Sequence, residues 1–286
     1  MKKSIVNHAD TFLLGDLPIQ RMGFGAMRLT GPNIWGDPIS IQEARAVLRR
    51  AIELGVNFID TADSYGPEVS ENIIAETLHP YPSGLVIATK GGLVRPGPDS
   101  WKPLGRPEYL MQCVEMSLRR LRLGCIDLYQ LHAVDPQVPL EDSLGALKIM
   151  QKQGKIRYIG LSNVSVSEIE RARKIVDVVS IQNQYNLTHR QSESVVAYCE
   201  KHQLAFIPWY PIGSGNLARS EGALHMLAKL KGVSTAQIAL AWLLNHSPVM
   251  VPIPGTSTLE HLEENVASTA LDFAPNELAQ LDALEG

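Results

Sequence analysis

The sequence predicts an α/β protein in which eight parallel strands close into a (β/α)8 TIM barrel. From about residue 40 onward, short β-branched runs alternate with amphipathic segments, and no Pro-, Gly- or Ser-rich linker divides the chain. Eight strand candidates with roughly one helix after each match the count of a closed barrel, and right-handed crossovers favour parallel pairing.

The predicted elements follow in chain order. Strands are expected at 21–26, 56–60, 85–89, 126–130, 156–161, 178–183, 204–208 and 249–253. Helices are expected at 41–54, 69–79, 107–122, 140–153, 166–174, 191–201, 234–245 and 258–270. Gly55 and Gly154 are typical helix stops, and Ser234 is a typical N-cap.

Both ends of the chain carry additions to the barrel. Residues 11–20 hold Gly15 and Asp16 between two apolar pairs, which predicts a short N-terminal hairpin that closes the bottom of the barrel. The segment from Pro275 to Leu284 predicts an extra C-terminal helix packed outside.

Length and composition limit the protein class. A chain of 286 residues suits one barrel or two smaller domains, and the missing linker favours one domain over 1–286. The net charge of −4 argues against a nucleic-acid partner. Three cysteines without a CxxC pair suit a reducing compartment, and no apolar run approaches the ~20 residues that span a bilayer. We therefore expect a cytoplasmic protein without a membrane partner.

Polar residues interrupt three of the apolar runs where each predicted strand ends. Asp60 and Tyr65 follow the second strand, Lys90 the third and His132 the fourth. In a barrel these positions meet at the C-terminal rim, where barrel enzymes have their active sites. Each residue alone has an ordinary structural explanation, as a turn cap, a buried aromatic, a surface lysine or a loop histidine. The four together favour a catalytic site.

The four side chains suit the reduction of a carbonyl group. A tyrosine can donate the required proton at neutral pH if its pKa is brought down from about 10. We expect the ammonium of Lys90 to lower the pKa of Tyr65, and Asp60 to hold that ammonium in place. His132 would hydrogen-bond the carbonyl oxygen and orient it.

Six stretches in one order resemble the aldo-keto reductase family over nearly the whole chain. They are residues 55–66 (GVNFIDTADSYG), 88–91 (ATKG), 128–132 (LYQLH), 159–163 (IGLSN), 182–186 (QNQYN) and 251–256 (VPIPGT). The resemblance implies the same four catalytic residues, with Tyr65 as the general acid.

The resemblance also implies a nicotinamide cofactor. Ser162 and Asn163 would hydrogen-bond its carboxamide, with Gln182 alongside, and Trp209 would stack on its ring. The segment 208–213 resembles the family's aromatic-Ser-Pro-Leu-Gly turn, with a tyrosine in place of the serine. The cofactor residues implied in and after this turn are Tyr210, Pro211, Gly213, Gly215 and Leu217.

The adenosine-phosphate end departs from the family pattern. His261 stands where many relatives place an arginine, and Ser257 supplies no positive charge. NADPH is the expected cofactor, and NADH stays an alternative. The residues implied at this end are Gly255, Thr256, Ser257, His261, Glu264 and Asn265.

Two other signals do not support a different chemistry. The stretch 23–28 begins like a dinucleotide fingerprint but lacks its third glycine. The eight histidines include no HxH or HExxH pair, so no metal site is expected.

The expected function is reduction of aldehydes or ketones by a monomer acting on a small-molecule carbonyl substrate. Trp35 and Trp101, in long loops after the first and third strands, would wall an aromatic pocket, although Trp101 has an equal claim to anchor its own loop. Within the family the pattern is closest to small bacterial-type members, including pyridoxal reductases. The alternative is a nucleotide-sensing regulatory subunit of the same fold.

Overall fold

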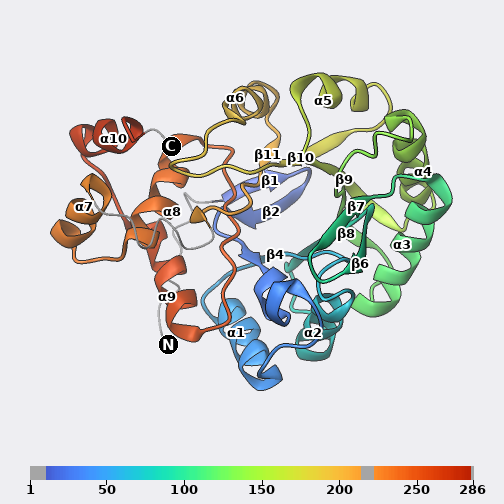
Figure 1. The fold of residues 1–286 in the computed structure, drawn as a ribbon, viewed down its shortest axis with the longest axis horizontal. Coiled ribbons are helices and arrows are strands. Elements are labelled where there is room, and N and C mark those ends of the chain that lie inside the picture. Colours follow the sequence, from blue (N-terminus) through green and yellow to red (C-terminus); the bar gives the residue numbers. More distant parts are fainter. Residues whose placement is uncertain (1–10, 214–221, 285–286) are drawn as a thin grey trace.

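A curled sheet of seven parallel strands, ringed by helices, forms the centre of the molecule (Figure 1). The computed structural model describes residues 11–213 and 222–284. In spatial order the strands are β3 (Phe24–Gly25), β4 (Phe58–Asp60), β5 (Val86–Gly91), β8 (Ile126–Leu131), β9 (Ile156–Ser162), β10 (Val178–Gln182) and β11 (Ala205–Phe206). Neighbours in the sheet follow one another along the chain, as the predicted barrel requires.

The segment 249–253 closes the ring without forming a regular strand. Met250 forms an isolated parallel bridge with Phe206 of β11. On the other side, the backbone N–H of Gly23, just before β3, donates to the carbonyl of Pro252. A strand was predicted here, and the ladder is interrupted because Pro252 and Pro254 have no N–H to donate.

The helices pack outside the sheet, and the ends of all except α7 match the predictions to within a few residues. They are α1 (Ile41–Glu53), α2 (Val69–Leu78), α3 (Pro107–Leu121), α4 (Leu140–Lys152), α5 (Val166–Ala172), α6 (Glu193–His202), α7 (Ala223–Lys231), α8 (Thr235–His246), α9 (Leu259–Ala267) and α10 (Pro275–Asp282). Ser234 caps α8, because its hydroxyl accepts from the backbone N–H of Gln237. Gly55 and Gly154 follow α1 and α4 in left-handed conformations, at φ 95° and 75°. None of the described helices is long and apolar enough to cross a bilayer.

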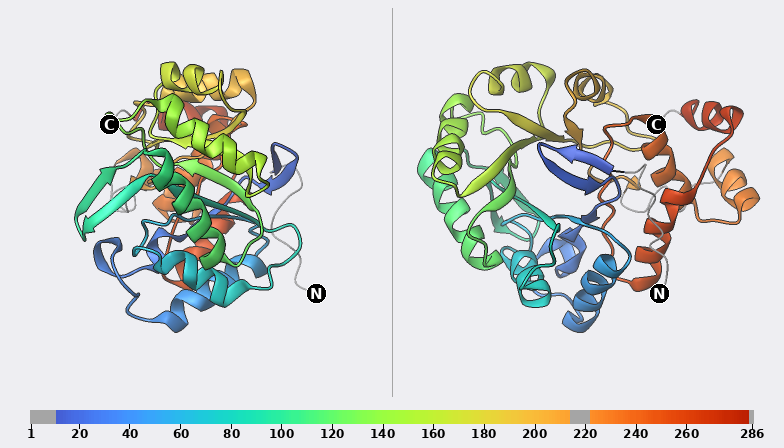
Figure 2. Two further views of the ribbon diagram at one scale, coloured as in Figure 1. Left: turned by 90° about the vertical axis from the view of Figure 1, so that its right-hand side faces the viewer. Right: turned by 180° about the vertical axis from the view of Figure 1, so that it is seen from behind.

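Two hairpins lie at opposite ends of the barrel (Figure 2). The predicted one consists of β1 (Thr11–Leu14) and β2 (Leu17–Gln20), which pair antiparallel. Its Leu14 and Ile19 are fully buried and pack into the barrel interior with Phe58 and Leu128. The second hairpin, β6 (Leu93–Gly97) and β7 (Ser100–Pro103), stands over the opposite rim, in a segment that the sequence predicted only as a loop.

Helix α7 was also not predicted. Its Leu224, Leu227 and Ala228 are buried, but Met226 and Leu230 are 67% and 78% exposed. Apolar residues therefore lie on both faces of the helix, which weakens the amphipathic pattern that identifies a helix in a sequence.

Candidate active site

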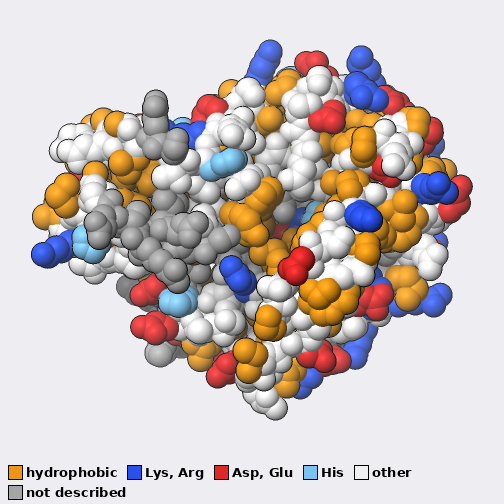
Figure 3. Space-filling model, viewed as in Figure 1, with side chains coloured by type: hydrophobic (Ala, Val, Ile, Leu, Met, Phe, Trp, Pro, Cys, Tyr) orange, Lys and Arg blue, Asp and Glu red, His pale blue; other side chains and the backbone are white. Residues whose placement is uncertain are grey.

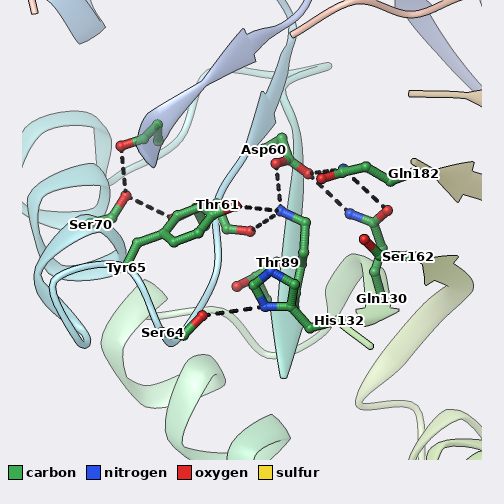
Figure 4. Close-up of polar contacts among 12 residues, drawn as sticks. Asp60, Thr61, Ser64, Tyr65, Ser70, Thr89, Gln130, His132, Ser162 and Gln182 are labelled. Atoms are coloured by element: carbon green, nitrogen blue, oxygen red, sulfur yellow. Dashed lines mark hydrogen bonds and ion pairs between the residues drawn. The ribbon is translucent and has the colours of Figure 1, made fainter. Parts of the chain in front are cut away.

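The carboxyl ends of five strands bring predicted catalytic and cofactor residues to one rim (Figure 4). Asp60 ends β4, Lys90 lies near the end of β5, and His132 directly follows β8. Ser162 and Gln182 end β9 and β10. Parallel register places these strand ends side by side, because Asp60 pairs with Ala88 of β5 and Lys90 pairs with Gln130 of β8.

Lys90 is the centre of the buried polar network. Its side chain is completely buried, and its Nζ donates to Asp60 Oδ2 at 2.6 Å, the Thr61 carbonyl at 2.9 Å and the Tyr65 hydroxyl at 3.3 Å. The three acceptors use all three ammonium hydrogens. Burial acts to lower the pKa of Lys90, but the Asp60 carboxylate and the Tyr65 hydroxyl outweigh it and raise the pKa. Lys90 is therefore charged at neutral pH.

Two glutamine side chains complete the hydrogen bonds of Asp60. Its Oδ1 accepts from Gln130 Nε2 at 3.0 Å and from Gln182 Nε2 at 2.9 Å. The sequence analysis missed Gln130, although a polar residue inside an apolar strand was a usable signal. Gln182 faces the cavity as expected, but its amide N–H is used by Asp60.

Burial changes the expectation for Tyr65. Burial raises the pKa of this phenol, and the nearby Lys90 ammonium lowers it by less than burial raises it. The prediction of a net lowered pKa was therefore wrong, although the effect of Lys90 itself has the expected sign. The phenol is protonated at neutral pH, which is the form a proton donor needs.

His132 is a neutral imidazole at the edge of the cavity. Burial, and secondly the charge of Lys90, hold its pKa well below the usual value. Its Nδ1 lies 3.3 Å from the hydroxyl of Ser64, a residue that the sequence analysis did not single out. When Ser64 donates to Nδ1, the hydrogen of the imidazole is on Nε2. The Tyr65 and His132 rings meet edge to face at 5.9 Å.

A cavity of about 890 Å³ opens above these residues. In Figure 3 a hollow lies near the centre of this face, bordered by hydrophobic side chains. Its lining includes three of the four predicted catalytic residues, because Lys90 lies buried beneath them. The predicted residues that line it are Asp60, Tyr65, His132, Trp101, Ser162, Asn163, Gln182, Trp209, Tyr210, Pro211, Gly255, Thr256, Ser257, His261, Glu264 and Asn265.

Hydrogen bonds fix the middle of the cavity wall. Asn163 adopts a left-handed conformation at φ 59°, and its amide nitrogen donates to the His132 carbonyl at 3.0 Å. Its Oδ1 accepts from the indole N–H of Trp209, also at 3.0 Å. The ring of Tyr210 packs edge to face on Trp209 at 4.9 Å. An amide and a flat indole are thereby held in fixed positions beside the catalytic residues.

The far end of the cavity lies at the N-terminus of α9. Thr258 caps this helix, and Thr256 and Ser257 precede it. Arg28 lines the same end, and its Cγ lies 3.5 Å from where a Cβ on Gly255 would be. The sequence analysis missed several other residues of the cavity lining, which include Met27, His225, Ala228, Lys229, Val233, Ser234, Thr235 and Ala236.

Two predicted residues, Trp35 and Gly213, do not line the cavity, and two others are not described by the structure. Trp35 does not line the cavity; its backbone forms a bridge with Gly66, and its ring lies 5.4 Å from the guanidinium of Arg95. Gly213 ends the first described segment and is not among the described residues that line the cavity. The predicted residues Gly215 and Leu217 lie outside the described part of the chain.

Known proteins resemble this chain over almost all of its length. The family model for the aldo/keto reductase family matches residues 21–285. An uncharacterized oxidoreductase of Schizosaccharomyces pombe is 52% identical over 276 residues, covering 96% of this chain and 90% of the relative. Pyridoxine 4-dehydrogenase of Escherichia coli is 40% identical over 282 residues, covering 96% and 98%.

Solved structures of the same family superpose on this chain over almost all of its length. An aldo-keto reductase of Klebsiella pneumoniae in complex with NADPH superposes with a TM-score of 0.83 at 25% identity, covering 96% of this chain and 94% of the other. A glycerol dehydrogenase of Gluconobacter oxydans gives a TM-score of 0.88 at 27% identity, covering 97% and 95%. This chain folds as a (β/α)8 barrel and belongs to the aldo/keto reductase family of oxidoreductases.

Proposed function

We propose that the protein reduces aldehydes or ketones to alcohols with NADPH, using Tyr65 as the proton donor. The observation that carries the proposal is the buried chain from Asp60 through Lys90 to the Tyr65 hydroxyl, which faces the cavity beside His132. A neutral phenol on a charged lysine is an acid whose anion is stabilised at the moment the proton leaves.

The cavity fits a nicotinamide dinucleotide. Its volume is in the range of small-molecule sites, and it runs from the catalytic residues past Trp209 to the N-terminus of α9. Trp209 offers a flat face, and the helix end with its hydroxyl groups suits a phosphate. Bound there, NADPH would supply the hydride for the carbonyl carbon.

Positive charge at the far end favours the phosphorylated cofactor. Arg28 and Lys229 line the cavity, and neither forms an ion pair within residues 11–213 and 222–284. His261 and Ser257 provide no fixed charge, so we assign the interaction with the extra phosphate of NADPH to these two cations.

Each residue at the catalytic end then has a separate role in the reduction. The Nε2–H of His132 and the hydroxyl of Tyr65 hydrogen-bond the carbonyl oxygen and polarise it. Tyr65 gives its proton to that oxygen as the alkoxide forms, and Lys90 stabilises the phenolate left behind. Asp60 keeps Lys90 charged and in position.

We propose an aromatic aldehyde, pyridoxal first, as the substrate. The name of the Escherichia coli relative describes oxidation of pyridoxine, and reduction of pyridoxal is the reverse type of reaction. The indole of Trp101 lies 6.4 Å from the Tyr65 ring and 6.5 Å from the His132 ring, which gives the catalytic end aromatic walls.

The test is oxidation of NADPH and of NADH in the presence of pyridoxal, benzaldehyde and propanal, with Tyr65→Phe as the control. We expect turnover with NADPH, and the phenylalanine variant should lose nearly all of it while its NADPH affinity, measured by protein fluorescence, stays the same. Cofactor binding without turnover on any carbonyl would instead favour the sensor alternative. Normal turnover by Tyr65→Phe would refute the acid assignment.

A further inference from the structure

Arg95 occupies an unusual position above the catalytic rim. It lies on β6, it is 9% exposed, and its guanidinium forms no ion pair with a carboxylate of the described chain. Instead, its N–H groups donate to five backbone carbonyls, which matches the five donors of an arginine. The carbonyls belong to Asn33, Ile34, Ser64, Pro98 and Ser100.

These carbonyls join three segments that are far apart in the sequence. The first is the 3₁₀ turn Pro32–Ile34, between β3 and α1. The second is the loop between Asp60 and Tyr65, and the third is the β6–β7 hairpin itself. The three segments surround the substrate end of the cavity, where Ile34, Tyr65 and Trp101 all contribute to the lining. Arg95 therefore connects the loops that determine the shape of this end.

Arg95 also contacts the aromatic wall directly. Its guanidinium carbon lies 3.5 Å from the centre of the Trp101 ring, a stacking distance. Trp101 is on β7 and 37% exposed, so packing alone holds it weakly. The Tyr65 and His132 rings lie in T-shaped contact with it on the catalytic side. The stacked guanidinium fixes the position of Trp101 relative to both.

We propose that Arg95 is a positioning residue that gives the enzyme its preference for flat aromatic carbonyl substrates, by holding Trp101 as one wall of the substrate pocket. The inference rests on the proposed reductase function. Arg95 itself does not contact the substrate, because all five of its N–H donors are used within the protein. A lysine cannot replace it, since an ammonium has three donors and no planar face to stack on the indole.

The chain contains a matched control. Arg190 also donates to backbone carbonyls, those of Leu187, Leu281, Asp282 and Leu284, and its guanidinium carbon lies 4.6 Å from the ring centre of Trp242. Neither Arg190 nor Trp242 lines the cavity. Arg190→Lys thus removes the same kind of contact at a place with no role in the substrate pocket.

The experiment compares Arg95→Lys, Trp101→Leu, the double variant and Arg190→Lys, with NADPH as cofactor and benzaldehyde or propanal as substrate. We expect Arg95→Lys to raise KM for benzaldehyde about tenfold, with a change in kcat and in propanal kinetics below about threefold. Trp101→Leu should give the same pattern, and the double variant should be no worse than either single variant, because both changes remove one wall. Arg190→Lys should leave the ratio of kcat/KM for benzaldehyde to kcat/KM for propanal unchanged.

Several outcomes would overturn the proposal. Equal losses for both aldehydes would mean that Arg95 is only structural, as would loss of folding in both Arg95→Lys and Arg95→Gln while Arg190→Lys still folds. Additive effects in the double variant would show that Arg95 does not act through Trp101. A wild-type protein that reduces neither these two aldehydes nor pyridoxal would contradict the proposed function itself. That result is read from the wild type, whereas failure of the Arg95 proposal is read from the variants of an active wild type.

Discussion

The two ends of the cavity are built in opposite ways. At the catalytic end, Lys90 and Asp60 are buried and belong to strands, and they form hydrogen bonds with neighbouring strands and with the loop that follows β4. In the rest of the cavity lining, Arg28, Lys229 and His261 are exposed, lie on a 3₁₀ turn or on helices, and have no ion pair among the residues described.

This difference separates chemistry from cofactor choice. A buried ion pair is expensive to break, so the catalytic end tolerates little change. Exposed cations on the far end can be exchanged without exposing an uncompensated charge. We expect substitutions at the catalytic end to abolish turnover, and substitutions at the far end to alter only the cofactor preference.

The largest effect should follow from Lys90→Met. The phenolate of Tyr65 loses its stabilising charge, and we expect kcat to fall about a thousandfold. Reduction requires the protonated phenol, so its rate falls as the pH passes the pKa of Tyr65. Because Lys90 lowers that pKa, its removal should move the alkaline limb of the pH–rate profile to higher pH. Steady-state kinetics from pH 6 upward measure both effects.

Lys155→Met is the control for this change. Lys155 pairs with Glu115 at the surface, at the opposite end of β9 from the site. The Lys155→Met variant should keep wild-type activity. A residual Lys90→Met activity with an unshifted pH profile would argue against the role of Lys90 in tuning the phenol.

An intermediate effect is expected at the far end. Arg28→Ala should weaken NADPH binding about tenfold and NADH binding much less, because it removes a charged partner of the extra phosphate. Lys229→Ala should act in the same direction. Fluorescence titration with each cofactor gives the ratio of affinities. Equal weakening for both cofactors would place these cations at the pyrophosphate instead.

The last effect concerns stability at the catalytic end and leaves turnover and cofactor affinity aside. Asp63 is buried, its Oδ1 has no hydrogen-bond partner among the described residues, and burial, with Glu71 nearby, raises the pKa of Asp63 to about 7. The native state therefore holds this proton more tightly than the unfolded chain, where the pKa is about 3.9. The stabilisation is complete below about pH 4 and is lost as the pH rises towards 7.

Asp63→Asn removes this titration. Relative to the variant, the wild-type free energy of unfolding should fall by at most about 1.4 kcal/mol per pH unit between about pH 4 and 7. Urea unfolding at pH 5, 6, 7 and 8 measures the difference. Ser257→Ala, at the exposed end, adds and removes no titratable group in this range and should leave the slope unchanged. A parallel pH dependence in wild type and Asp63→Asn would show that Asp63 is ionised in the native state.

The sequence was most informative where buried strands end. Apolar runs that stop at Asp60, Lys90 and His132 identified both the strands and the polar rim, because a parallel barrel brings all strand ends to one side. The Gly15 turn and the Ser234 cap were also local signals, and the structure confirms them. The roles of these site residues and the extent of the single domain stay predictions.

Other features escaped the sequence analysis for physical reasons. Prolines obscured the β6–β7 hairpin and interrupted the strand expected at 249–253. Apolar residues on both faces obscured α7. Arg95 showed no signal, since its partners are backbone carbonyls from three distant segments, and a carbonyl has no sequence signature.

The sequence by itself determined the barrel, the order of its strands and the four residues that meet at its rim. These depend on local hydrophobic patterns and on the fixed geometry of parallel strands. Only the tertiary structure decided that burial raises the pKa of Tyr65, that Gln130 and Gln182 hold Asp60, and that Arg95 supports Trp101. Desolvation and contacts between distant segments produce these properties, and both exist only in the folded chain.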